Sequence, residues 1–394
     1  MKLLVLCERV DAEGGTESYL RTLLPALLAR GDDVRVLARG VKDKEAYGVP
    51  CEAIAWSDEH DPPSSDAASR VAVFAQTFGP DAVAAHNVLD AGVLAAARSN
   101  APRFVYHLHD HRPFCPNGDR LYPQGGGICE LPMGALVCGY HALVRGCAYG
   151  PRPRTFGLVG IREEVALALV GADAVVSLSH YMATTAQRNG VLPANGRVVA
   201  PPLEASAFAA APAPRPQTDA VLFAGRVMAS KGARSLVRAL ALIEESRKPL
   251  LRIAGDGPDL DATVGEAEHH GVPTEVLGRL GAAAMRDAYD AATLVAVPSL
   301  WAEPYGLVGI EAFARGRPVV AYAAGGIPEW IDASGGGGIA VRRGDEPALA
   351  RAIASLLETQ RWAAASQRAF DASHAYRLDA HVDALRAIYR GGSP

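Results

Sequence analysis

The chain has 394 residues, with 39 lysines and arginines against 43 aspartates and glutamates and a formal net charge of −4. This length predicts two domains, and the balanced charge gives no reason to expect a nucleic-acid partner. The first apolar run is too short for a signal peptide, and no run is long enough for a membrane span. Six cysteines without an export signal favour a reducing compartment. We therefore expect a cytoplasmic protein, with membrane association not indicated.

Short β-rich runs alternate with longer helical patterns along the whole chain, which predicts parallel sheets covered by helices. The strands expected in the first half are 2–8, 33–39, 81–86, 103–110, 173–179 and 197–201. Those expected in the second half are 220–227, 250–257, 274–280, 294–299, 318–326 and 338–343. The fold class is therefore α/β, with two doubly wound Rossmann-like domains. Ligands bind at the carboxyl ends of such strands, so the expected site is a cleft where the two domains face each other.

Alanine and proline are concentrated between the two halves, and this composition indicates a stiffened linker. We predict an N-terminal domain over 1–205, a linker over 206–219 and a C-terminal domain over 220–375. The amphipathic end of the chain, 376–394, is expected to be a helix that folds back on the N-terminal domain.

Gly14 and Gly15 separate the first expected strand from a long amphipathic helix. No G-x-G-x-x-G is present there, so a standard dinucleotide fingerprint is absent. Glycines at this position can serve a tight strand-to-helix turn or the close approach of a ligand.

Alternating histidines occupy the end of the strand expected over 103–110. His107, His109 and His111 could share one strand face, and three histidines at this spacing could bind zinc. Asp110 and a loop follow at once, however, so strand geometry is expected to end near His109. His107 is then a packed or hydrogen-bonded strand residue.

The segment 112–160 is long for a connection between a strand and a helix, and such segments often shape binding sites. We therefore expect this segment to shape the binding site of a substrate. It contains four cysteines within 33 residues: Cys115, Cys129, Cys138 and Cys147. Four thiolates would suit a structural zinc ion, but no C-x2-C pair is present, so free thiols are the alternative.

Two cations flank the loop after the strand expected over 220–227. Arg226 and Lys231 lie five residues apart, before a helix. Converging cations suit a pyrophosphate, both when it is bound and when it departs with its negative charge. Solvated surface charges are the simpler interpretation of the pair. Gly255 follows the next strand in a glycine turn, which alone is a weak signal.

The stretch 301–330, WAEPYGLVGIEAFARGRPVVAYAAGGIPEW, combines two carboxylates with a helix start. Gly306 lets the backbone approach a ligand closely, and the amides of Gly306, Leu307 and Val308 point outward at a helix N-terminus, which suits phosphate. Glu303 lies ahead of this helix. Glu311 lies about one turn inside it, where a carboxylate could accept two hydrogen bonds from a ribose diol.

The region from Pro298 to Glu329, which includes a PS at 298–299 and a GG-x-PE at 325–329, closely resembles the E-x7-E region of retaining GT-B glycosyltransferases of the large fourth sequence family. The resemblance extends over essentially the whole C-terminal domain. It implies that Arg226 and Lys231 grip a donor diphosphate, with Gly255 alongside the nucleotide.

In the N-terminal domain, the same resemblance implies that the Gly-Gly turn faces the donor phosphate. It also implies that His109, in an HD pair with Asp110, touches the transferred sugar, with Asp110 a helper. Some family members carry a comparable cysteine-rich insert, with a closer central pair than Cys129 and Cys138.

The resemblance implies an enzyme, a retaining hexosyltransferase. It would move a sugar from a UDP-, GDP- or ADP-sugar to a hydroxyl of a sugar, lipid or natural-product acceptor. Glu303 would hold the sugar, and Arg226, Lys231 and the helix amides would stabilise the leaving diphosphate, with no cofactor or metal needed for catalysis. The alternatives are a nucleotide-sugar epimerase or phosphorylase of the same fold, or a non-catalytic sugar-nucleotide binding subunit. The nucleotide base, the sugar, the acceptor and the oligomeric state are not indicated.

Overall fold

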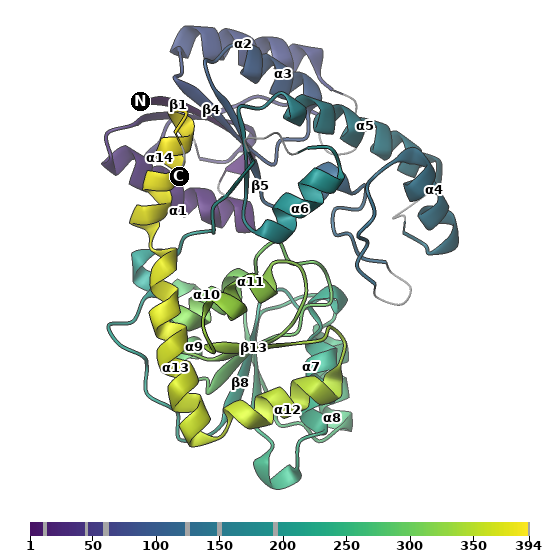
Figure 1. Ribbon diagram of the computed structural model, residues 1–394, viewed down its shortest axis with the longest axis vertical. Helices are drawn as coiled ribbons and strands as arrows, with labels where there is room; N and C mark the ends of the chain where they lie inside the picture. Colours follow the sequence, from purple (N-terminus) through teal and green to yellow (C-terminus); the bar gives the residue numbers. More distant parts are fainter. Residues whose placement is uncertain are drawn as a thin grey trace. The chain divides into compact units, whose positions relative to one another are not determined.

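The computed structural model describes residues 1–10, 14–43, 46–57, 63–122, 127–147, 152–191 and 196–392. The chain divides into two compact units, unit 1 with Met1–Pro202 and Leu378–Pro394, and unit 2 with Leu203–Arg377. Each unit contains one parallel sheet flanked by helices (Figure 1). The predicted fold class, two Rossmann-like α/β sheets, is confirmed.

The sheet of unit 1 has seven strands in the order β3-β2-β1-β4-β5-β6-β7, and all neighbouring strands are parallel. Their bounds are β1 Lys2–Val10, β2 Asp33–Val41, β3 Cys51–Ala53, β4 Ala82–His86, β5 Phe104–Leu108, β6 Ala174–Ser177 and β7 Gly196–Val198. β3 was not predicted from the sequence, because three residues at a sheet edge are too few to show a period. The strand order reverses between β1 and β4, and sheets of this kind bind ligands at such a reversal.

Two apolar clusters, one on each face, hold the helices of unit 1 against its sheet. The helices are α1 Gly15–Ala29, α2 Ser65–Phe78, α3 Ala91–Ser99, α4 Ala135–Val144, α5 Arg152–Val170, α6 His180–Arg188 and α14 Leu378–Tyr389. α2, α3, α5 and α6 contribute to one cluster, and α1 and α14 to the other. Leu385, Ile388 and Tyr389 of α14 are almost fully buried there, so the last helix is part of the core of unit 1.

The sheet of unit 2 has six parallel strands in the order β10-β9-β8-β11-β12-β13 and reverses between β8 and β11. The strands are β8 Ala220–Ala224, β9 Leu250–Ala254, β10 Thr274–Gly278, β11 Leu294–Val297, β12 Val319–Tyr322 and β13 Gly338–Val341. The helices are α7 Ala233–Ala241, α8 Leu260–His269, α9 Ala282–Asp290, α10 Leu307–Ala314, α11 Ile327–Ala333, α12 Glu346–Leu356 and α13 Thr359–Ser373. α7, α8 and α12 share an apolar cluster with the sheet, and α10 and α11 lie on its other side (Figure 1). Every strand predicted from the sequence is present.

The alanine- and proline-rich segment lies within unit 2 and is tied to it by backbone hydrogen bonds. Ala209 and Ala213 donate to the carbonyls of Ala314 and Arg315, which end α10. The guanidinium of Arg215 reaches the carbonyl of Leu357 at 2.6 Å. This segment therefore packs against unit 2 and is hydrogen-bonded to it.

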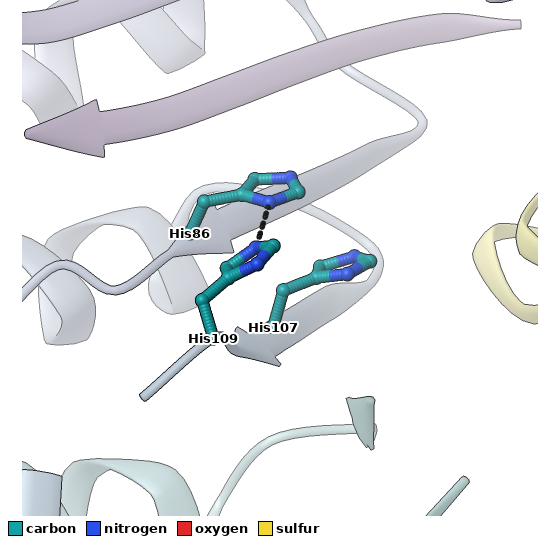
Figure 2. Close-up of side chains that lie close together, drawn as sticks. All are labelled: His86, His107 and His109. Carbon is teal, nitrogen blue, oxygen red and sulfur yellow. Dashed lines mark hydrogen bonds between the residues drawn. The ribbon is translucent and has the colours of Figure 1, made fainter. Parts of the chain in front are cut away.

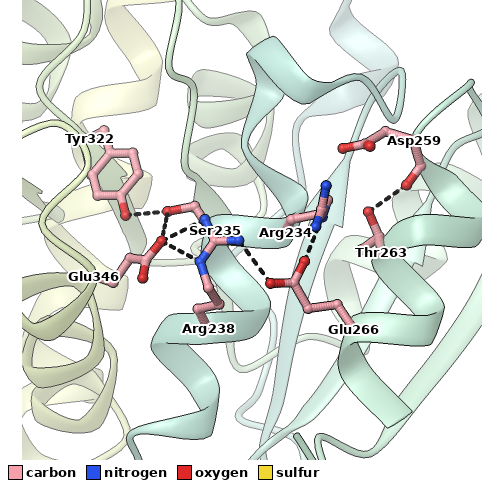
Figure 3. A network of polar contacts seen from close by, with 8 residues as sticks. All are labelled: Arg234, Ser235, Arg238, Asp259, Thr263, Glu266, Tyr322 and Glu346. Atoms are coloured by element: carbon pink, nitrogen blue, oxygen red, sulfur yellow. Dashed lines mark hydrogen bonds and ion pairs between the residues drawn. The ribbon is translucent and has the colours of Figure 1, made fainter. Parts of the chain in front are cut away.

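A polar network joins α7, α8 and α12 on the outside of unit 2 (Figure 3). Arg238 donates to Glu346 at 2.7 Å and to Glu266 at 2.8 Å, and Arg234 also donates to Glu266. Ser235 connects this network inward to the Tyr322 hydroxyl at 2.7 Å. Burial by itself would raise the pKa of Glu266, but the hydrogen bonds and charges of the two arginines outweigh it and lower that pKa.

We expect Glu266→Gln to destabilise the protein by roughly 1 kcal/mol at neutral pH, the scale of a partly exposed ion-pair network. Because the folded-state pKa of Glu266 is depressed, its contribution is present above the unfolded pKa and is lost as pH falls through the folded value. Urea unfolding at neutral pH and near pH 3 measures this difference. Glu268→Gln, on the exposed side of the same helix, is the matched control. An equal loss of stability in both variants at both pH values would contradict the assignment.

Among the described residues, no helix combines the length and the apolar character needed to cross a lipid bilayer.

Candidate active site

Two loops of unit 2 meet where its strand order reverses. Gly225 and Arg226 follow β8 directly, and Glu303 lies in the loop after β11. Arg226 is exposed at this edge, whereas Glu303 is only 6% exposed. The reversal therefore brings the predicted cation and carboxylate to the edge at which open α/β sheets bind ligands.

Lys231 and Glu303 form an ion pair at this edge. The Lys231 Nζ donates to Glu303 Oε1 at 2.7 Å, and the Ser299 hydroxyl donates to the same oxygen at 2.5 Å. The ammonium also lies 4.9 Å from the ring centroid of Trp301, a cation–π distance. The sequence assigned Lys231 and Glu303 separate partners and did not predict their pairing. Ser299 is part of the PS that precedes the first glutamate of the family pattern, and this was its sequence signal.

Two glycines allow the backbone segments around the Lys231–Glu303 pair to pack closely, because a side chain at either glycine would clash with the neighbouring backbone. Gly232 has φ 74°, and a Cβ there would be 2.0 Å from the Pro298 carbonyl oxygen. Gly325 has φ 64°, and a Cβ there would be 2.1 Å from the Glu303 carbonyl oxygen. The next residue, Gly326, donates its N–H to that same carbonyl at 2.8 Å. The GG turn of the family pattern thus packs directly on the backbone of Glu303.

The surroundings of Glu303 keep its carboxylate charged although it is buried. Burial by itself would raise its pKa, but the charge and hydrogen bond of Lys231, with hydrogen bonds from Ser299 and Trp301, lower it below the ordinary value. A carboxylate offers about four lone-pair sites. A buried, ionised carboxylate at the ligand-binding edge of a sheet is suited to accept hydrogen bonds from the hydroxyl groups of a ligand.

The helix after this loop, α10, begins at Gly306, which has φ 96°. This left-handed conformation favours glycine, and a Cβ at Gly306 would also make a tight contact of 3.2 Å with the Ile327 side chain. Leu307 and Val308 begin the helix, and the first amides of a helix have no partner within it. This helix start lies a few residues after Glu303 in the chain, and helix N-termini of this kind are suited to bind anions.

Glu311 lies one turn into α10, where Tyr289 at the end of α9 donates its hydroxyl to Glu311 Oε2 at 2.7 Å. Burial raises the pKa of Glu311, and the Tyr289 hydrogen bond opposes this shift. Tyr289 was not identified from the sequence, because its motif is an ordinary helix end. It fixes one carboxylate oxygen and so orients the group.

Close packing against the backbone of unit 2 explains why residue 255 is a glycine. A Cβ there would lie 1.9 Å from the carbonyl oxygen of Gly225, and one at Gly257 would lie 2.3 Å from that of Val227. The Gly225 and Val227 amides donate to Ala254 and Asp256. This glycine turn thus supports the loop that carries Arg226.

In unit 1, the strand order reverses between β1 and β4, and α1 starts at that reversal, with Gly14 as its N-cap and Gly15 as its first residue. A Cβ at Gly14 would come 2.2 Å from the carboxylate of Glu17, whereas one at Gly15 would meet nothing within 4 Å. Gly14 makes room for a buried carboxylate, and Gly15 leaves open space. Residues 11–13 of the same turn lie outside the described residues.

Three buried histidines form a stack at the ends of β4 and β5 (Figure 2). The register pairs His86 with His107 across the two strands, and their rings stack at 4.2 Å. His109 follows β5 and shares a 2.9 Å hydrogen bond with His86. The strand ends at Leu108, which confirms the end predicted near His109. Burial lowers the pKa of His109 to about 4 and those of His86 and His107 well below their usual range.

The ligand atoms of these three histidines lie within 4.8 Å of one another, but their geometry opposes metal binding. The rings are within 28° of parallel, and an imidazole lone pair lies in its ring plane, so the three cannot converge on one ion. His107 instead shares a 2.9 Å hydrogen bond with Tyr389 of α14, as expected for a hydrogen-bonded strand histidine. His111 is not part of the group, as expected from a strand that ends near His109. It follows the strand end and packs edge-on against Tyr181.

Asn87 clamps the His109–Asp110 pair from the end of β4. It has φ 54°, a conformation that asparagine tolerates better than most residues. Its Oδ1 accepts the His109 amide at 3.0 Å, and its Nδ2 donates to Asp110 at 2.9 Å. Asp110 also pairs with Arg112 at 2.8 Å. The sequence signal for this residue, a His-Asn pair directly after a strand, was not used.

The segment 112–160 contains an irregular stretch, α4 and the start of α5, and residues 123–126 and 148–151 lie outside the described part. The six cysteines all lie in the described part of the chain, and none of them forms a disulfide. Four of them line one small cavity in this segment: Cys115, Cys129, Cys138 and Cys147.

Comparison with known proteins identifies the class to which this fold and site belong. Residues 13–206 match the sequence model of Glycosyltransferase Family 4, and residues 218–359 match that of Glycosyl transferases group 1. The D-inositol 3-phosphate glycosyltransferase of Mycolicibacterium paratuberculosis is 30% identical over 315 residues, covering 76% of this chain and 70% of that protein. The glycogen synthase of Mycobacterium tuberculosis is 28% identical over 388 residues, covering 90% of this chain and 85% of that protein.

Solved structures agree on the fold. Anabaena HepE in complex with UDP superposes with a TM-score of 0.74 at 21% identity, covering 98% of this chain and 99% of that one. The sucrose-phosphate synthase of Thermosynechococcus elongatus gives a TM-score of 0.72 at 20% identity, covering 99% and 98%. The chain belongs to glycosyltransferase family 4, and it is a retaining glycosyltransferase with the GT-B fold. The predicted family, fold and enzyme class are confirmed.

Proposed function

We propose that unit 2 binds a nucleoside-diphosphate sugar and that the enzyme transfers its sugar to an acceptor hydroxyl with retained anomeric configuration. The observation that carries this proposal is the buried, ionised Glu303 held by Lys231 next to the start of α10. This arrangement offers a carboxylate that can accept hydrogen bonds from sugar hydroxyls. It also offers the Lys231 ammonium and the N-terminus of α10 as positively charged groups for phosphate.

The diphosphate is assigned to Arg226, Lys231 and the amides of Gly306, Leu307 and Val308. A lysine ammonium has three N–H donors, and Glu303 takes one of them. As the anomeric C–O bond breaks, negative charge builds on the departing phosphate, and fixed cations and helix amides stabilise that charge. Each such donor typically contributes about 3 to 4 kcal/mol to lowering the barrier.

Glu303 and Glu311 have separate roles in this proposal. Glu303 accepts hydrogen bonds from hydroxyls of the transferred sugar. Glu311, which Tyr289 orients, accepts hydrogen bonds from the ribose diol. Retention follows from attack on the face from which the phosphate leaves, with a phosphate oxygen taking the acceptor proton. The donor nucleotide to test first is UDP, since the fold neighbour HepE has been crystallised with UDP-glucose.

The acceptor is assigned to unit 1, through His109 and the segment 112–160. His109 is neutral at physiological pH because its pKa is near 4, so it can donate or accept a hydrogen bond without carrying charge. The backbone of His109 is fixed by Asn87 at 3.0 Å. Asp110, already engaged by Asn87 and Arg112, acts through His109 rather than as an independent base.

A thermal-shift screen with UDP-, GDP- and ADP-sugars tests the donor assignment. A donor at 100 times its Kd should stabilise the protein by about 2.7 kcal/mol, and Arg226→Ala should reduce that shift at the same concentration. Arg247→Ala, an exposed cation elsewhere in unit 2, is the matched control and should keep the full shift. The absence of a shift with all three classes, or an undiminished shift in Arg226→Ala, would contradict the proposal.

A further inference from the structure

Four cysteines that are not adjacent in sequence gather around one cavity in the segment between β5 and α5. The cavity has a volume of about 30 Å³, and a space of this size holds roughly one water molecule or one small ion. The four thiols come from different local structures: the end of a 3₁₀ turn, a short antiparallel bridge, helix α4 and the residues after it. Their order in the chain is Cys115, Cys129, Cys138 and Cys147. Their convergence is therefore a tertiary feature of this segment.

Hydrogen-bond donors already point at these sulfurs. The Cys115 sulfur accepts hydrogen bonds from the backbone amides of Asn117 and Arg120, and the Cys138 sulfur accepts one from the backbone amide of Gly134. The Asn117 side chain approaches the Cys147 sulfur at 3.8 Å. N–H donors favour the thiolate over the thiol, and the thiolate is the form that binds metal.

The thiols also interact with one another electrostatically. Four thiolates at this spacing repel one another, and a divalent cation among them removes that repulsion, so metal binding would be accompanied by proton release.

We propose that Cys115, Cys129, Cys138 and Cys147 bind one zinc ion as four thiolate ligands, and that this ion holds the segment 112–147 together. Four sulfur ligands are typical of structural zinc. Zinc–sulfur bonds of about 2.3 Å require sulfurs about 3.8 Å apart in a tetrahedron. Among the described cysteines no three sulfurs lie within 4.8 Å of one another, so zinc binding contracts the cavity.

His141 lines the same cavity, and its Nδ1 is buried without a hydrogen-bond partner. It defines the rival ligand set, three thiolates and one imidazole. The two sets differ in an observable way, because one of the four cysteines would then be dispensable for metal binding and His141 would be essential.

The first experiment measures metal in the purified full-length protein. We expect about one zinc per chain, and tetrahedral sulfur-ligated spectra when cobalt replaces zinc. Cys129→Ser and Cys147→Ser should lose the metal. Cys51→Ser, a buried cysteine on strand β3 outside the segment, and His141→Ala should keep it. Iron instead of zinc, or zinc retained in both serine variants, would overturn the proposal. Loss of zinc in His141→Ala with retention in one cysteine variant would overturn the four-thiolate ligand set.

A second measurement does not depend on variants that fold poorly. Zinc is removed from the wild-type protein with a chelator, and thiol reactivity is followed as zinc is returned. One equivalent should protect four of the six cysteines, with affinity that rises with pH because protons are released. Unchanged thiol reactivity would overturn the proposal. The donor-induced thermal shift belongs to unit 2 and should persist without zinc, so this test and that of the proposed function fail separately.

Discussion

Lys231→Ala is expected to lower kcat/KM for sugar transfer by about 10²- to 10³-fold, because one stabilising cation of the departing diphosphate is lost. The same change leaves the buried Glu303 without its ion-pair partner. Burial then dominates, and the pKa of Glu303 rises instead of falling. The acid limb of the pH–rate profile should therefore move to higher pH in the variant. Steady-state kinetics across pH measures both effects.

The control for this variant is Lys248→Ala. Lys248 is also an ion-paired lysine of unit 2, bonded to Glu245 at 2.6 Å, but it lies away from the reversal of the sheet. It should retain wild-type turnover. Glu303→Gln should lower kcat/KM by a similar factor, and the double variant should lose little more than either single one, because paired residues act as a unit. Wild-type turnover by folded Lys231→Ala would end the assignment.

The sequence predicted the site residues that follow one another along the chain. Gly306, Leu307 and Glu311 lie on one turn and one helix, so their relative positions follow from local geometry. Glu303 was located by the same short motif. The strand ends that carry Arg226 and His109 were predicted because apolar runs end in glycine or charged residues there.

The contacts that tune these residues could not be predicted, since they join distant parts of the chain. Lys231 meets Glu303 across 72 positions, and Tyr289 meets Glu311 across 22. His86 lies beside His107 only because β4 and β5 are neighbours in register. Periodicity describes one element at a time, and side-chain pairing between elements depends on strand order.

The packing roles of the glycines also depend on contacts between distant parts of the chain, which the sequence does not reveal. The sequence indicated that Gly306 and Gly255 serve a ligand, and for Gly255 the structure gives a packing reason within the protein. The GG turn near 325 was used only as a family signature. Its physical cause, contact with the backbone of Glu303, becomes visible only when both loops are placed.

Gly325→Ala is expected to destabilise unit 2 strongly and to displace Glu303. A Cβ at this position would lie 2.1 Å from the Glu303 carbonyl oxygen and 2.6 Å from its amide nitrogen. Both obstructing atoms are backbone, so no side-chain rotation relieves the clash. We expect a loss of about 3 kcal/mol or more in the free energy of unfolding. Displacement of Glu303 should also reduce kcat/KM in whatever fraction remains folded. Chemical denaturation and single-turnover assays on the folded fraction measure the two effects.

Gly335→Ala separates the steric effect from that of backbone conformation. Gly335 has φ 61°, close to the 64° of Gly325, but a Cβ there would meet nothing within 4 Å. It should cost only the roughly 1 to 2 kcal/mol of a left-handed alanine and leave turnover unchanged. If the two variants lost equal stability and equal activity, contact between the Gly325 turn and Glu303 could not be what holds the carboxylate in position. A larger loss confined to Gly325→Ala would instead tie catalysis to that backbone contact, because the two substitutions differ only in what the added methyl group meets.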